Sequence, residues 1–146
     1  MNQNHPQRAL ELFSQGYNCA QSVFAACATD EELTESQRLA LAGPFGGGIA
    51  RQGEICGALT GALLALGEAE GSAMAADPVV GRDALYERAH QLTEAFRAAH
   101  GSIVCRELTG CALDTGEGQR HFKARGLHQN LCNKLVAFAA GQVDKK

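Results

Sequence analysis

The feature that most constrains the fold is a glycine-rich loop that runs directly into an apolar helix led by a cysteine, residues 43–67. Gly57 and Gly61 fall in the first turn and a half of this helix, where each glycine costs about 1 kcal/mol relative to alanine. This cost is explained if another backbone or a bulky group approaches closely. Both glycines are therefore predicted to contact a cofactor or a neighbouring helix, from the same chain or, in a homodimer, from a second one.

Helical periodicity and capping signals divide the remaining chain into further helices. Asn18 and Thr34 are each followed three residues later by glutamine, which predicts capping boxes. Val80, Leu85, Leu92 and Phe96 are expected to form the inner face of a long helix. The predicted helices cover residues 6–15, 19–28, 35–43, 56–67, 78–100, 103–108 and 131 onward. No segment alternates with a strand period, so the prediction is an all-α, compact bundle of about six helices, with residues 1–146 forming a single domain and residues 110–126 a loop.

Composition excludes several classes of function. The net charge is −3 and tryptophan is absent, whereas nucleic-acid binding requires a basic surface. No apolar run reaches the roughly 18 residues of a membrane span, so no membrane insertion is expected. The polar N-terminus does not resemble a signal peptide, which predicts a cytoplasmic protein.

The six cysteines carry the strongest functional signal. They are Cys19, Cys27, Cys56, Cys105, Cys111 and Cys132. In a cytosolic protein, clustered cysteines bind metals or perform chemistry more often than they form structural disulfides. The absence of a Cys-x-x-Cys pair argues against thioredoxin-like, zinc-ribbon and ferredoxin sites.

Four of these residues, Cys19, Cys56, Cys105 and Cys132, fall in the first turns of predicted helices. A helix N-terminus stabilises a thiolate, so the pKa of Cys56 is expected to be lowered, although the nearby Glu54 opposes this effect. Four thiolates at one point repel one another unless a cation or a covalent bond relieves the repulsion. The two chemistries that follow are a thiolate-bound metal or iron–sulfur cluster and thiol/disulfide exchange by a cysteine pair, in which these cysteines would be the catalytic redox thiols.

A third hypothesis is a helical accessory protein in which cysteines serve packing alone, as is expected for Cys27 and Cys111. His128, close before Cys132, is a weaker candidate ligand for a mixed cysteine and histidine zinc site. Arg51 and Arg106 lie near motif cysteines in the sequence. Each is expected either to stabilise a thiolate or to pair with a neighbouring glutamate.

The motifs resemble a known family along nearly the whole chain, about residues 5 to 140. The segments that carry the resemblance are Gly16-Tyr17-Asn18-Cys19-Ala20-Gln21, Gly46-Gly47-Gly48, Gly53-Glu54-Ile55-Cys56-Gly57-Ala58-Leu59-Thr60-Gly61 and Cys105-Arg106-Glu107-Leu108-Thr109-Gly110, with Cys132 opening the last helix. In this order they are similar to the C_GCAxxG_C_C family, which is described as redox-active and is frequently linked to transporter loci. The resemblance therefore implies that the accessory protein of the third hypothesis would be associated with a transporter.

The resemblance implies that Cys19, Cys56, Cys105 and Cys132 are the four characteristic cysteines. A related domain in split-Soret cytochromes is thought to hold an iron–sulfur centre with these residues. The chain lacks a Cys-x-x-Cys-His haem attachment site, so covalent haem is not implied. The combined expectation is a redox-active protein, with an unidentified redox partner, whose four cysteines bind an iron–sulfur cluster or another soft metal for electron transfer.

Overall fold

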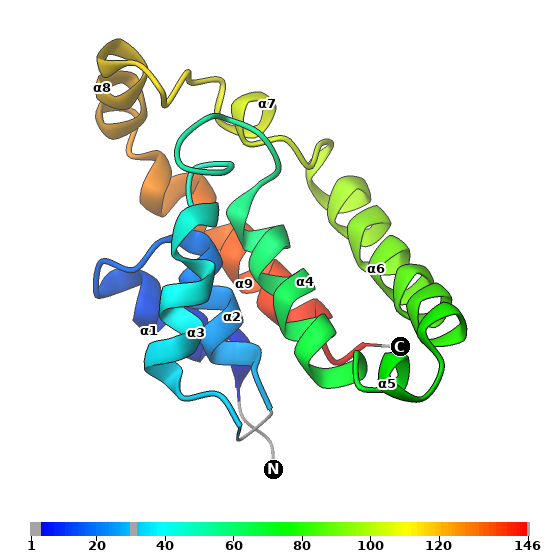
Figure 1. The fold of residues 1–146 in the computed structure, drawn as a ribbon. Coiled ribbons are helices and arrows are strands. Elements are labelled where there is room, and N and C mark those ends of the chain that lie inside the picture. The colour runs from blue at the N-terminus through cyan, green and yellow to red at the C-terminus, as the bar shows by residue number, and fades with distance from the viewer. Residues whose placement is uncertain (1–3, 30–31, 146) are drawn as a thin grey trace.

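The computed structural model describes residues 4–29 and 32–145, and in these ranges the secondary structure is helical (Figure 1). The predicted all-α class is confirmed, but about six helices was too few. The elements are α1 (His5–Ser14), α2 (Cys19–Cys27), α3 (Glu35–Ala42), η1 (Gly43–Phe45), α4 (Gly57–Glu70), α5 (Ala73–Ala76), α6 (Pro78–His100), α7 (Cys105–Thr109), α8 (Gly116–Ala124), η2 (His128–Cys132) and α9 (Asn133–Gln142). The single-domain organisation of residues 1–146 stays a prediction.

Helix starts follow the capping signals of the sequence closely. Asn18 accepts a hydrogen bond from the Gln21 backbone, and the Gln21 side chain accepts one in return from the Asn18 backbone. The same reciprocal pair joins Thr34 and Gln37 at the start of α3. Both predicted capping boxes are therefore present, and the first of them fixes where α2 begins.

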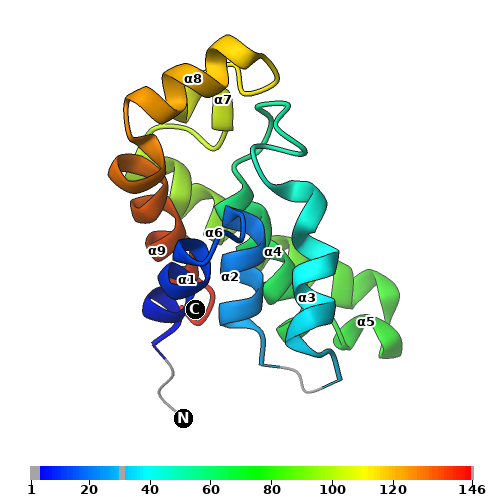
Figure 2. The ribbon, with the colours of Figure 1, turned by 90° about the vertical axis from the view of Figure 1, so that its left-hand side faces the viewer.

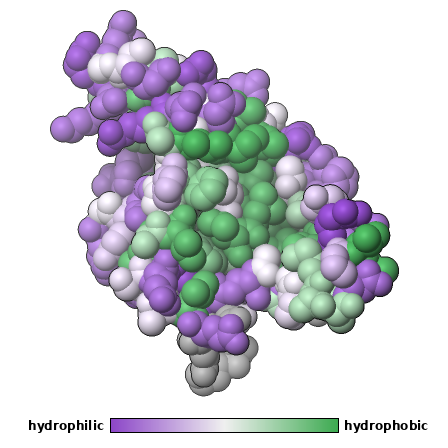
Figure 3. Space-filling view, in the orientation of Figure 1, coloured by the Kyte–Doolittle hydropathy of each residue, from purple (hydrophilic) through white to green (hydrophobic). Residues whose placement is uncertain are grey.

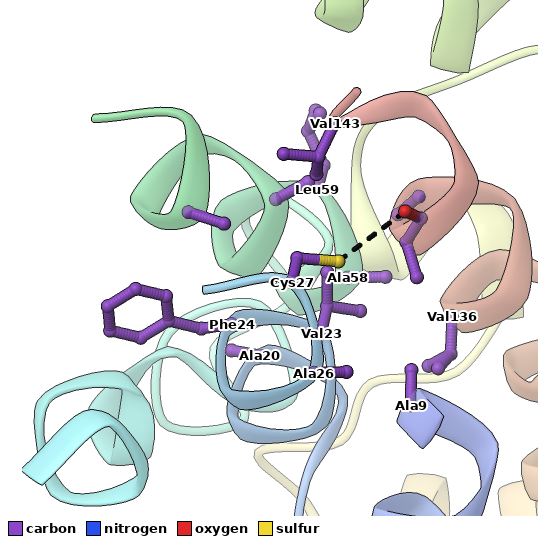
Figure 4. Packing of buried hydrophobic residues seen from close by; sticks show 14 of the residues in the cluster. Ala9, Ala20, Val23, Phe24, Ala26, Cys27, Ala58, Leu59, Val136 and Val143 are labelled. Atoms are coloured by element: carbon purple, nitrogen blue, oxygen red, sulfur yellow. Dashed lines mark hydrogen bonds between the residues drawn. The ribbon is translucent and has the colours of Figure 1, made fainter. Parts of the chain in front are cut away.

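The core lies where α1, α2, α4 and α9 pack together, as both ribbon views show (Figures 1 and 2). Gly61 allows α2 and α4 to approach closely, because a Cβ atom there would lie 2.5 Å from the Ala20 carbonyl oxygen. Of the two contacts predicted for this glycine, the structure provides the one with a neighbouring helix of the same chain. Cys27 lies in this core, and its Sγ donates a hydrogen bond to the Ala140 carbonyl at 3.4 Å (Figure 4).

The stabilisation that Cys27 provides relative to alanine should decrease as the pH rises. Burial, with a smaller contribution from the charge of Asp144, raises the pKa of Cys27 from 9.0 to about 12. A raised folded-state pKa gives stability that is complete below pH 9 and decreases between pH 9 and about 12, by about 1.4 kcal/mol per pH unit. Urea unfolding of the metal-free, reduced protein should therefore show the wild-type advantage over C27A shrinking by about 1 kcal/mol from pH 9 to 10, because half of the unfolded thiols are already ionised at pH 9. A constant difference would contradict this account.

An ion pair joins α3 to the far part of α4 beneath the surface. Arg38 Nη2 donates to Glu68 Oε1 at 2.6 Å, and Arg38 Nε also lies within hydrogen-bond distance of the same carboxylate. The two side chains are only 10% and 7% exposed. At this depth a charge without its partner is costly, so the pair holds α3 in place against α4.

The long helix α6 packs against the core along less of its length than its apolar pattern predicted. Leu92 and Phe96 are buried and Leu85 is half-buried, as expected. Val80 is 65% exposed, so its predicted place on the inner face was wrong. The first turns of α6 contact the short α5 rather than the core. Apolar surface is visible over the middle of the face that Figure 3 draws in the orientation of Figure 1.

The segment predicted as a loop over residues 110–126 contains a helix, so that prediction was wrong. Thr115 caps α8 by accepting from the Gly118 backbone N–H at 2.9 Å. Gly118 is needed here because the Ala112 carbonyl occupies the position that a Cβ atom would take. α8 stands apart from the central bundle, at the end that carries the loop before Cys56 (Figures 1 and 2).

Candidate four-cysteine site

A pocket of about 570 Å³ is lined by all four cysteines of the predicted set, which are separated by up to 113 positions in the sequence. Cys19 is the first residue of α2, Cys56 directly precedes α4, Cys105 is the first residue of α7, and Cys132 ends η2. Helix starts thus bring three of the sulfurs to the pocket, as the sequence suggested. Cys27 and Cys111 do not line this pocket and are buried in apolar clusters.

The fourth cysteine reaches the pocket by a different route from the one predicted. The last helix was predicted to begin at residue 131 with Asn130 as its cap, but the Asn130 side chain instead donates to the Arg125 carbonyl at 3.1 Å. A π-helical turn, η2, precedes α9 without a break, and Cys132 has right-handed helical φ and ψ angles. Extra residues in a helical turn are often found at functional sites. Here the turn carries Cys132 and His128 to the same pocket.

The glycine loop forms an unusual left-handed turn beside the pocket. Five consecutive residues, Gly47 to Arg51, have positive φ angles, and the last three of them are not glycine. The turn is held by backbone hydrogen bonds such as Ala50 N–H to the Pro44 carbonyl at 2.8 Å. Left-handed backbone costs a non-glycine residue about 1–2 kcal/mol, so surrounding structure must maintain this conformation.

Backbone contacts from this loop connect two of the cysteines. The Cys105 N–H donates to the Glu54 carbonyl at 2.6 Å, and the Cys56 N–H donates to the Ile103 carbonyl at 2.8 Å. Gly48 lies beneath Cys105, because a Cβ atom on Gly48 would be 2.8 Å from the Cys105 Cβ. The starts of α4 and α7 are therefore fixed next to each other.

Backbone amides surround the Cys19 sulfur. Burial raises the pKa of Cys19, while the N–H groups of Gly47, Ala20 and Gly57, with that of Cys19 itself, act in the opposite direction. These amides come from the left-handed turn, from α2 and from α4. Converging N–H groups stabilise an anionic sulfur. A thiolate is therefore favoured at Cys19 if a bound cation also compensates for the hydration that the buried sulfur lacks.

Burial makes the other three thiols weak acids as well. The expected lowering of the Cys56 pKa was wrong, because burial and the charge of Cys19 raise it more than the Ala58 and Leu59 amides at the helix N-terminus lower it. Burial, followed by the charge of Cys19, raises the pKa of Cys105 to about 11 and that of Cys132 to about 12. Cys19 is thus within electrostatic reach of each of the other three sulfurs.

The histidine and the two arginines that were singled out from the sequence differ in their positions relative to the pocket. His128 lines the pocket but stacks on Phe13, with ring centroids 3.9 Å apart and planes inclined by 7°. Arg106 pairs with Asp114 at 3.4 Å rather than with Glu107, and its charge acts to lower the pKa of Cys105. Arg51 lines the pocket. In residues 4–29 and 32–145, no three histidine, cysteine or acidic side chains are arranged to hold a single metal ion.

The part of the pocket that α8 contributes was not predicted from the sequence. Gln119 and Phe122 line it from this helix, and Leu113 lines it from the preceding turn. The signal for the helix was Thr115 followed by an acidic residue in the first turn, Glu117, but two glycines obscured it. The half-buried Tyr17, which belongs to the motif segment around Cys19, also lines the pocket although no role was predicted for it.

Replacing Gly57 by alanine should damage the site without unfolding the chain. Gly57 lines the pocket, and a Cβ atom there would overlap the Cys19 sulfur and lie 2.9 Å from the Phe45 carbonyl. Because the Cys19 sulfur must move, we expect G57A to bind any metal or cluster at this site at least about tenfold more weakly. Metal content after reconstitution measures the effect.

Gly67 provides the matched control in the same helix, since nothing lies within 4 Å of its Cβ position. G67A should bind normally and be more stable by up to about 1 kcal/mol, because alanine favours helix over glycine. Equal metal content in G57A and wild-type protein would contradict the assigned contact between Gly57 and Cys19.

Comparison with known protein families identifies a match that spans most of the chain. A family described as "Putative redox-active protein (C_GCAxxG_C_C)" matches residues 17–146. The matched range includes all four cysteines that line the pocket and most of its other walls. No curated protein and no solved structure matched the chain. None of the helices among the described residues is long and apolar enough to cross a bilayer.

Proposed function

The chain belongs to the C_GCAxxG_C_C family, and on this basis we propose that it is an electron-transfer protein whose four pocket cysteines hold an iron–sulfur cluster. The observation that carries the proposal is the convergence of Cys19, Cys56, Cys105 and Cys132 on one pocket from four separate elements. Four thiolates are the usual ligand set of such clusters.

The donor set fits this group better than it fits a single ion. All four thiols line a pocket of about 570 Å³, which has room for a cluster of several atoms, and the described residues include no compact group of three ligands for one ion. Amides converge on Cys19, and hydrogen bonds to cluster sulfurs and ligands tune reduction potentials. When bound, the cluster would supply one-electron chemistry, while the chain supplies ligands, excludes water and fixes the amides. Another soft, thiolate-bound metal is the alternative occupant.

Thiol/disulfide exchange has less support from the same site. Exchange requires a thiolate, and the optimum attacking thiol has a pKa near the ambient pH. The pKa values of Cys105 and Cys132 are raised to about 11 and about 12, so at neutral pH about one molecule in 10⁴ or fewer has either thiol ionised. A bound cation removes this obstacle because thiols that coordinate a metal lose their protons.

The test is chemical analysis of protein purified without oxygen. We expect visible absorption together with iron and acid-labile sulfide in a fixed ratio to the chain, and no zinc. The absorption should bleach on reduction and return on reoxidation. A colourless protein that cannot be reconstituted with iron and sulfide contradicts the proposal. A reversible two-electron titration of such a protein, without metal, would instead support thiol/disulfide exchange.

A further inference from the structure

Most of the pocket lining comes from residues other than the four cysteines. Its volume of about 570 Å³ lies within the range of roughly 300–1,000 Å³ that is typical of small-molecule sites. Aromatic side chains form much of the remaining wall. Phe13 and His128 contribute their stacked rings, Tyr17 lies next to the start of α2, and Phe122 approaches from α8. An apolar or aromatic ligand body would find matching surfaces here.

Charge in the pocket is distributed differently from charge in the chain as a whole. The chain has 16 acidic and 13 basic residues, yet no aspartate or glutamate within residues 4–29 and 32–145 lines the pocket. Arg51 does line it, and the described residues offer this guanidinium no ion pair or side-chain hydrogen bond. Arg51 is exposed at the rim of the pocket, where the described residues place neither a carboxylate nor another partner for it. Such an arginine is suited to a ligand that carries a carboxylate of its own.

Arg51 belongs to the strained left-handed turn of the backbone. Arg51 has a φ angle of 66°, and the two residues before it also lie in the left-handed region without being glycine. Its side chain passes over Gly47, because a Cβ atom on Gly47 would lie 3.0 Å from the Arg51 Cγ. The amide of the same glycine faces Cys19. One strained turn therefore places a cation and an amide donor toward the same pocket, and strain of this kind is concentrated at functional sites.

The α8 wall is tied to the pocket by its own contacts. Gln119 Nε2 donates to the Leu113 carbonyl at 2.9 Å. Phe122 packs on a small apolar cluster, separate from the main core, that includes Cys105 and Cys111. The helix thus places Phe122 on one side of the pocket while Arg51 lines it from the glycine loop.

We propose that this pocket binds a small organic carboxylate, with its negative group at Arg51 and an apolar or aromatic body against Tyr17 and Phe122. The inference rests on the proposed function only in that the ligand would lie beside the metal-loaded cysteines. The competing explanation is that Arg51 merely offsets the negative charge of the four thiolates. The two explanations differ in what removing the guanidinium does to ligand affinity and to metal content.

The test uses benzoate as the probe and neutral benzamide as its uncharged counterpart, titrated calorimetrically into the anaerobically loaded protein. We expect benzoate to bind and benzamide to bind at least about tenfold more weakly, as loss of a charge-assisted hydrogen bond requires. R51Q should weaken benzoate binding by at least about tenfold while keeping wild-type metal content. R51K, which keeps the charge, should retain more affinity than R51Q.

R120Q is the matched control, because Arg120 is an exposed arginine of α8 that does not line the pocket, and it should bind benzoate normally. The inference is overturned if benzoate does not bind, if R51Q binds it as wild-type protein does, or if R51Q loses metal but not benzoate affinity. Should the protein hold no metal, the same titrations on the metal-free chain test the inference separately from the proposed function.

Discussion

Replacing any one of Cys19, Cys56, Cys105 or Cys132 by serine should abolish stable binding of the iron–sulfur cluster. Each substitution removes one of the four thiols around the pocket and leaves the others with an incomplete ligand set. After anaerobic reconstitution, visible absorption and acid-labile sulfide should fall to background in all four variants. The effect should be similar in each, because residues that act as one unit lose function together rather than additively.

Cys111 gives a demanding control for these variants. It is buried and close enough to Cys105 that its charge contributes to raising the Cys105 pKa, yet it is not part of the pocket lining. C111S should therefore keep full cluster content even if it loses some stability. Circular dichroism and urea unfolding of the metal-free variants separate loss of ligands from loss of fold. A full cluster in one of the four serine variants, or none in C111S, would contradict the assigned ligand set.

The largest expected effect on stability comes from the ion pair between α3 and α4. Replacing Arg38 by methionine leaves Glu68 with a side chain only 7% exposed and without its short contact. Removing one partner of a buried pair typically costs about 3–5 kcal/mol, because the remaining charge is stranded away from water. Urea unfolding at neutral pH should show a loss of this size for R38M.

The double variant R38M/E68L distinguishes a stranded charge from lost packing. If the stranded carboxylate is the cause, removing it as well should restore most of the lost stability. R82M is the surface control, since Arg82 and Asp83 form a pair whose side chains are 48% and 63% exposed, and its effect should stay within about 0.5 kcal/mol. A double variant as unstable as R38M would show that packing, rather than charge, dominates at this position.

Local signals in the sequence predicted much of the fold because helix starts are encoded over a few residues. Asn18 with Gln21, Thr34 with Gln37, and Asp77 before Pro78 each mark a start that the structure contains. The capping box at Asn18 also placed Cys19 at the first residue of α2, whereas Cys56, which was predicted to be the first residue of its helix, directly precedes α4. Element identity could be predicted wherever capping and periodicity agreed.

Other features depend on contacts that local sequence does not encode. Ile49, Ala50 and Arg51 give no sign of left-handed backbone, which only the surrounding loop maintains. α8 was missed because glycine weakens a helix locally, while Gly118 is required because the turn that precedes the helix folds the Ala112 carbonyl against it.

The predicted shift of the Cys56 pKa had the wrong direction for a related reason. A helix N-terminus is visible in the sequence, but the depth of burial that outweighs it is a property of the folded chain.

Cysteine alkylation, followed by mass spectrometry, tests most directly whether the four sulfurs share one centre. In the loaded protein, Cys19, Cys56, Cys105 and Cys132 should all resist a small alkylating reagent, and chelation of the iron should make all four more reactive, each following the time course of iron loss. Cys27, buried in the main core, should react at the same rate before and after chelation. Four cysteines that react at unrelated rates, unaffected by iron removal, would contradict a shared centre.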